Sequence, residues 1–180
     1  MENNSEDILS LLDNLWMNFK NCRAHFPAIS NTMIGQKIIP TAPYYIADGF
    51  QVSFVLSEPL DQSKIDKMHE IGHWINENFV IRLCALLESR GIIPKDESKK
   101  IDQNVEGWKD IDLVRRLRNY FAHSSGKYNP SKNEHVKTME VLGKHLNIDI
   151  DGRENFPLMI DTVLEPLFKG CRKYAETKSA

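Results

Sequence analysis

A dense group of basic and polar side chains lies in the segment 112–126, which reads DLVRRLRNYFAHSSG. Arginine keeps its charge at physiological pH and can bind a phosphate through two parallel hydrogen bonds. Histidine titrates near neutrality, so His123 can accept or donate a proton. The two side-chain types together suit phosphodiester cleavage, in which the imidazole moves a proton and a guanidinium stabilises charge on the phosphoryl oxygens. This chemistry needs no metal ion, and we expect no cofactor.

The segment 110–123 has the spacing of an amphipathic helix, with an apolar face and a polar flank. The apolar face consists of Leu113, Val114, Leu117, Tyr120 and Phe121. The polar flank consists of Asp112, Arg116, Asn119 and His123. On an ideal helix Arg118 points about 140° away from His123. The segment therefore resembles half of a site more than a complete one. The alternative is an exposed helix face whose arginines pair with Asp110 and Asp112.

A second candidate site has the pattern H-E-x-x-H, formed by His69, Glu70 and His73. On a helix the two histidines can share a zinc ion, while Glu70 acts as general base on a bound water. A catalytic zinc site needs a third protein ligand, and no recognised ligand pattern follows. The apolar stripe of this helix centres near Ile75 and Phe79, which puts Glu70 on the opposite side. We interpret the histidines as boundary or surface residues and keep a zinc-dependent hydrolase as an alternative.

The elements that must position these residues are predicted to be helices. Helical spacing of apolar residues is found over 7–26, 61–91, 108–123, 131–146 and 156–174. Pro157 suits the first turn of the last helix, whereas Pro166 should kink or split it. The charged segment 94–107 is predicted to be a surface connection.

Residues 27–60 contain several prolines and show no helical period. Two apolar segments flank Asp48-Gly49, which predicts a small β-hairpin near 44–56. We expect this region to form a lid, a dimer contact or an RNA-binding surface. Together the patterns predict a mainly all-α, single-domain helical bundle of about five helices over 1–180, with 27–60 as an irregular insertion.

The overall composition is that of a soluble globular protein. Of 180 residues, 41% are apolar and 27% are charged, and the net charge is −2. Nucleic-acid binding would therefore need a local basic patch, and Arg115, Arg116 and Lys127 supply one beside Arg118. The N-terminus lacks the pattern of a signal peptide, no apolar stretch is long enough for a membrane span, and three distant cysteines suit a reducing compartment. We expect a cytoplasmic protein.

The sequence RNYFAH, from Arg118 to His123, resembles the Arg-x4-6-His signature of the HEPN superfamily (higher eukaryotes and prokaryotes nucleotide-binding). In that family a polar residue, often asparagine, follows the arginine, and Asn119 holds that position here. The preceding segment WINENFVIRLCALLESRG adds a similar long helix upstream of the motif.

The resemblance implies a helical bundle, usually a homodimer whose two motifs meet across the interface. It implies a metal-independent endoribonuclease of a toxin–antitoxin, abortive-infection or RNA-processing system, with RNA and a cognate antitoxin as partners. Other members only bind RNA or protein. Arg118 and His123 would be the catalytic pair and Asn119 a polar helper. Arg116 also satisfies the spacing, but the Arg118-Asn119 pairing matches the motif, and a dimer can bring Arg118 to the partner's site.

Overall fold

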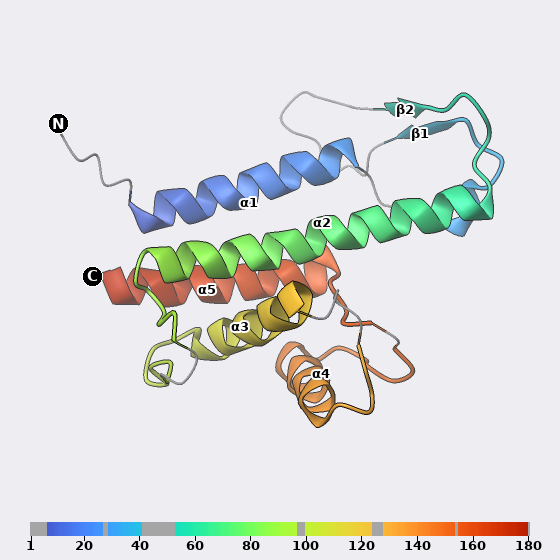
Figure 1. Ribbon diagram of the computed structural model, residues 1–180. Helices are drawn as coiled ribbons and strands as arrows, with labels where there is room; N and C mark the ends of the chain where they lie inside the picture. The colour runs from blue at the N-terminus through green and yellow to red at the C-terminus, as the bar shows by residue number, and fades with distance from the viewer. Residues whose placement is uncertain are drawn as a thin grey trace. The chain divides into compact units, whose positions relative to one another are not determined.

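The computed structural model describes residues 7–26, 29–40, 53–96, 100–123, 128–153 and 155–179. The described chain is mainly helical (Figure 1). Its elements are α1 (Ile8–His25), a 3-10 turn (Asn31–Met33), β1 (Ile38–Pro40), β2 (Ser53–Val55), α2 (Gln62–Ser89), α3 (Trp108–His123), α4 (Asn133–Leu146), a π-helical turn (Ile160–Leu164) and α5 (Glu165–Ser179). The predicted mainly all-α class is confirmed. No helix of the described ranges is long and apolar enough to cross a membrane.

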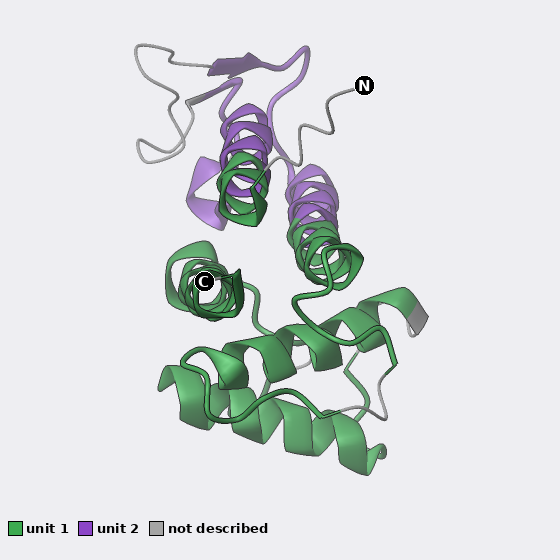
Figure 2. Cartoon of the chain, turned by 90° about the vertical axis from the view of Figure 1, so that its left-hand side faces the viewer, with its two compact units in different colours: residues 1–14, 76–180 green, residues 15–75 purple. Residues whose placement is uncertain are grey.

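The chain divides into two compact units, coloured separately in Figure 2. Unit 1 consists of Met1–Asn14 and Asn76–Ala180, and unit 2 of Leu15–Ile75. Both α1 and α2 therefore contribute residues to each unit. The interpretation of 1–180 as one domain stays a prediction, since compact parts of one chain need not fold independently.

Unit 2 contains the hairpin, in which β1 and β2 are antiparallel and Ile39 lies opposite Phe54. Alternation along the strands buries Ile39, which joins Ile29, Leu60 and Ile65 in a core cluster. Packing against the start of α2 stabilises a two-stranded sheet that would be marginal alone. The predicted small hairpin is confirmed, and the strand that pairs with β2 is 38–40, which precedes the predicted range 44–56. The predicted Asp48-Gly49 turn lies outside the described residues.

Unit 1 is built around α3, which packs against both α5 and α4. The end of α2 also lies on α5, where the rings of Phe79 and Phe168 are 6.3 Å apart. Two glycines allow α3 and α5 to approach closely. A Cβ on Gly107 would collide with the backbone of Gly170, and a Cβ on Gly170 would collide with Asp110. Gly107 also has φ of +87°, which favours glycine.

The start of the last helix differs from the prediction. The assignment of Pro157 to a first helical turn is wrong, because helical structure begins only at Ile160. A π-helical turn comes first, in which the Leu164 amide donates to the Met159 carbonyl at 3.0 Å. Pro166 follows as the second residue of α5. Proline lacks an amide hydrogen and clashes with the carbonyl four residues back, so a wider turn before it accommodates the ring.

Candidate functional site

The signature residues all lie on α3, which is helical from Trp108 through His123. Its inner face is fully buried at Ile111, Leu113, Val114 and Leu117. This burial holds the helix against the rest of unit 1 and leaves its remaining flanks for polar side chains. The predicted helical platform for the motif is thus confirmed.

Arg118 points toward α2, where it forms an ion pair with Glu88. Both side chains are largely shielded, with 19% and 16% exposed. The thiol of Cys84 lies 3.7 Å from the Glu88 carboxylate, one turn back along α2. Burial alone would lower the pKa of Arg118, but Cys84 and Glu88 outweigh burial and raise it. Arg118 therefore stays charged while its guanidinium is held inside the fold.

The same surroundings make Cys84 a poor nucleophile. Burial raises the pKa of the Cys84 thiol to about 11; nearby Arg118 opposes that increase and Glu88 adds to it. The thiolate is the reactive form of cysteine, so Cys84 stays protonated and acts as a packing residue.

Arg116 occupies a different environment on the polar flank. It forms an exposed ion pair with Asp112 at 2.7 Å, one turn earlier on α3. Exposed pairs of this type contribute about 0.2–1 kcal/mol, so Arg116 can exchange its partner for a phosphate. Asp110 instead pairs with His145 of α4 at 2.8 Å. Burial raises the pKa of the Asp110 carboxyl, and His145 partly offsets this increase.

Asn119 lies between the two arginine environments and is half-buried. Its carboxamide oxygen is shielded from solvent and has no hydrogen-bond partner among the residues the structure describes. A shielded acceptor without a partner costs about 1–3 kcal/mol, so it is a position where a donor would bind favourably. His123 follows one turn later as the last residue of α3. The side chain of His123, and Lys127, lie outside the described part of the structure.

Arg115 does not belong to an exposed basic cluster. Its side chain is buried, with 9% exposed, and it donates to the carbonyl of Asp96 at 3.5 Å. Arg115 therefore stabilises the connection that follows α2. Among the described residues of the predicted surface patch, only Arg116 is exposed.

An aromatic cluster supports the chain after α3, and sequence reasoning missed its role. The rings of Tyr120, Tyr128 and His135 surround Phe156 with centroid distances of 5.1, 5.6 and 5.8 Å. The backbone amide of Asn129 donates to Nδ1 of His135 at 3.1 Å, so this nitrogen carries no proton. Burial lowers the pKa of His135. The available signal was the position of His135 on the apolar stripe of α4, where Thr138, Met139 and Leu142 are also buried.

The H-E-x-x-H residues lie on α2 in unit 2, and their polar groups have local structural roles. The ring Nε2 of His69 lies 2.5 Å from the Ile29 carbonyl, to which it can only donate. Burial, and then the charge of Arg23, lower the pKa of His73. Glu70 is exposed, as expected. Within the described ranges, no group of three or more His, Cys, Asp or Glu side chains could hold a metal ion.

The comparisons with known proteins leave the site to be judged from its own geometry. No protein-family model matches the chain, no curated protein matches its sequence, and no solved structure matches its fold.

Proposed function

We propose that this chain is a metal-independent endoribonuclease of HEPN type that acts as a homodimer in a toxin–antitoxin or abortive-infection defence system. The observation that carries the proposal is the structural setting of the motif. Arg118, Asn119 and His123 lie on the final turns of an amphipathic helix in a helical unit. The shielded oxygen of Asn119, one turn before His123, has no hydrogen-bond donor within the described part of the chain.

The catalytic step divides between the proton and the phosphate. His123 takes the proton from a ribose 2′-hydroxyl, whose oxygen attacks the adjacent phosphorus, and the bond to the 5′-oxygen of the next nucleotide breaks as that oxygen takes a proton from water. The products are a 2′,3′-cyclic phosphate and a 5′-hydroxyl. An arginine binds the phosphoryl oxygens as charge develops there. Asn119 orients the imidazole by accepting a hydrogen bond through its carboxamide oxygen.

We assign the phosphate-binding role to Arg118, with Glu88 as the residue that holds it in the free protein. The ion pair keeps the guanidinium at a defined place between α2 and α3. A phosphate offers the same bidentate acceptor geometry as a carboxylate. RNA binding would then replace Glu88 as the partner of Arg118, while Arg116 contributes from the exposed flank.

The test is cleavage of labelled single-stranded RNA by the full chain, with and without EDTA. Wild type should cleave in both conditions, and His123→Ala should not cleave in either. His25→Ala is the matched control, because His25 is the exposed last residue of α1. Circular dichroism establishes that each variant is folded. Equal cleavage by wild type and His123→Ala would refute the proposal.

A second candidate function is a non-catalytic HEPN-like module that binds RNA or protein. The observation that favours it is the shielding of Arg118 by Glu88. This module would bind labelled RNA with the same affinity in wild type and His123→Ala, and would produce no cleavage in either.

A further inference from the structure

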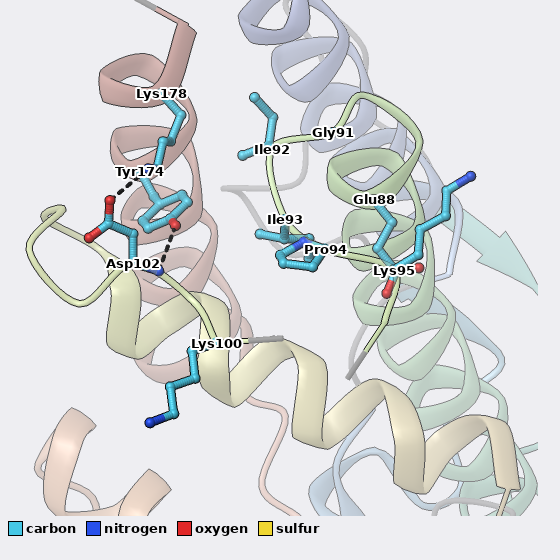
Figure 3. A pocket seen from close by; sticks show the side chains of 10 residues that line it. All are labelled: Glu88, Gly91, Ile92, Ile93, Pro94, Lys95, Lys100, Asp102, Tyr174 and Lys178. Atoms are coloured by element: carbon cyan, nitrogen blue, oxygen red, sulfur yellow. Dashed lines mark hydrogen bonds and ion pairs between the residues drawn. The ribbon is translucent and has the colours of Figure 1, made fainter. Parts of the chain in front are cut away.

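Unit 1 contains a pocket of about 550 Å³ (Figure 3). It is lined by the end of α2, the connection that follows it, and α5. Glu88 is one of its lining residues, so the partner of Arg118 forms part of the wall. The volume is within the range of about 300–1,000 Å³ typical of small-molecule sites.

One part of the lining is apolar and suits a flat, weakly polar group. In the middle of the view in Figure 3, Pro94 lies beside the buried Ile93, and Ile92 lies above them. On the α5 side the hydroxyl of Tyr174 accepts a hydrogen bond from the Asp102 amide at 3.3 Å. The ring is thereby fixed and is only 1% exposed, so it closes the α5 side of the pocket, across from the aliphatic side chains. The half-buried Ile92 and Pro94 remain as an apolar surface on which a nucleobase can pack.

The other part of the lining is charged, and its balance is positive. Lys178 is neutralised by Asp102 at 2.7 Å, and Glu88 is neutralised by Arg118. Lys95 also lines the pocket.

Lys100 is the remaining lysine of the lining, and it lies on the opposite side of the view from Lys95 (Figure 3). Neither lysine has an ion-pair partner among the described residues. Two ammonium groups on either side of an apolar surface match a chain of phosphates that carries a base between them.

We propose that this pocket binds a nucleotide of single-stranded RNA next to the cleaved phosphate, with Lys95 and Lys100 on the flanking phosphates. The inference rests on the proposed function for the identity of the ligand. Glu88 supplies the geometric connection, because it lines the pocket and also holds Arg118. A strand seated here would bring the next phosphate to Arg118 and then toward the end of α3.

The test uses His123→Ala as the background, so that bound RNA stays intact. Binding of a fluorescein-labelled single-stranded RNA is measured by anisotropy over a range of salt concentrations. Lys95→Gln/Lys100→Gln should reduce the steepness of log affinity against log salt concentration by about 1.4, since each phosphate contact on a single strand contributes about 0.7. The same relation gives a loss of affinity on the order of tenfold at about 0.1 M salt.

Lys137→Gln/Lys144→Gln is the charge-matched control, because both lysines are exposed on α4 and do not line the pocket. Equal affinity and slope in the two double variants would overturn the pocket assignment, and so would a background protein that binds no RNA. Cleavage by wild type is measured separately. If Lys95→Gln/Lys100→Gln weakens RNA binding but wild type does not cleave RNA, the pocket assignment stands and the endoribonuclease proposal is refuted. If wild type cleaves RNA but the lysine substitutions do not weaken binding, the endoribonuclease proposal stands and the pocket assignment is refuted.

Discussion

The two motif regions of this chain use their polar side chains in different ways. In the H-E-x-x-H segment of α2, the His69 ring binds a carbonyl and the Gly72 carbonyl accepts from Arg23 at 3.2 Å. These groups are occupied by contacts that hold unit 2 together. On α3 the oxygen of Asn119 has no partner among the described residues, and Arg118 is paired with Glu88, the partner that we propose a phosphate replaces. The two motifs therefore differ in the partners of their polar groups, and a short sequence pattern does not contain those partners.

The largest expected effect separates the two arginines of α3. Arg118→Ala should reduce the single-turnover cleavage rate by about 100–1,000-fold, the usual cost of removing a donor from developing negative charge. Arg116→Ala should cost less than about tenfold, because its exposed flank contributes mainly to RNA binding. Rapid-quench measurements with saturating RNA compare the two variants directly.

A control is needed because Arg118→Ala leaves Glu88 shielded without its cation. The double variant Glu88→Gln/Arg118→Ala removes both charges and should be folded but equally inactive. If Arg116→Ala shows the larger loss instead, the assignment of the catalytic arginine moves to Arg116.

The next effect compares glycines from the two regions. Gly170→Ala should destabilise the protein by about 2–3 kcal/mol, a typical cost of overpacking. The new methyl would collide with the whole Asp110 side chain, with Oδ2 and with Cβ at 2.7 Å, and His145 holds that carboxylate in place. Gly72→Ala should change stability by less than about 1 kcal/mol. Its methyl meets only the end of the Arg23 side chain, at 2.8 Å, and the helix gains from alanine.

Urea unfolding at neutral pH measures both glycine variants. Equal losses would show that the start of α3 is no more tightly constrained than the middle of α2. The positioning of the motif by the contact between α3 and α5 would then have no energetic support.

A smaller effect is expected from pH. Burial lowers the pKa of His135 and of His73 in the folded chain below the ordinary value of 6.5. The unfolded chain therefore takes up protons first as the pH falls through 6.5, and the free energy of unfolding decreases until the lowered pKa values are reached. Above pH 6.5 both rings are neutral in both states, and this contribution to stability is fully present.

Urea unfolding at intervals from pH 8 to pH 5 tests this dependence, above the range in which most carboxylates titrate. His135→Gln should flatten the curve, since the amide oxygen can still accept from Asn129. His73→Gln, a substitution in unit 2, should also flatten the curve of stability against pH. Stability that increases on acidification would contradict the neutral state of both histidines.

The sequence predicted the elements with a regular local cause and missed those that depend on distant partners. Apolar spacing was sufficient for α3, because every turn of Trp108–His123 places residues on the buried face. It also predicted the exposure of Glu70. The start of α5 was missed because the chain accommodates the Pro166 ring with a π-helical turn rather than with a kink.

The site itself was only partly predictable. The pattern indicated Arg118, Asn119 and His123 through a resemblance to a known signature, but it contained no information about Glu88. That partner lies 30 residues from Arg118 in the chain and meets it only after α2 and α3 pack. Arg115 was placed on the surface because helical projection does not show the connection at Asp96, which covers it. The pairing of β2 with 38–40 likewise depended on a core cluster formed with α2.

The most direct test of the central claim is the chemical identity of the RNA ends produced in EDTA. Wild type should produce fragments with 2′,3′-cyclic phosphate and 5′-hydroxyl ends, and His123→Ala should produce none above the uncatalysed background. Fragments with 3′-hydroxyl ends, cleavage abolished by EDTA, or identical fragments from His123→Ala would contradict the assignment of His123 to metal-independent RNA cleavage.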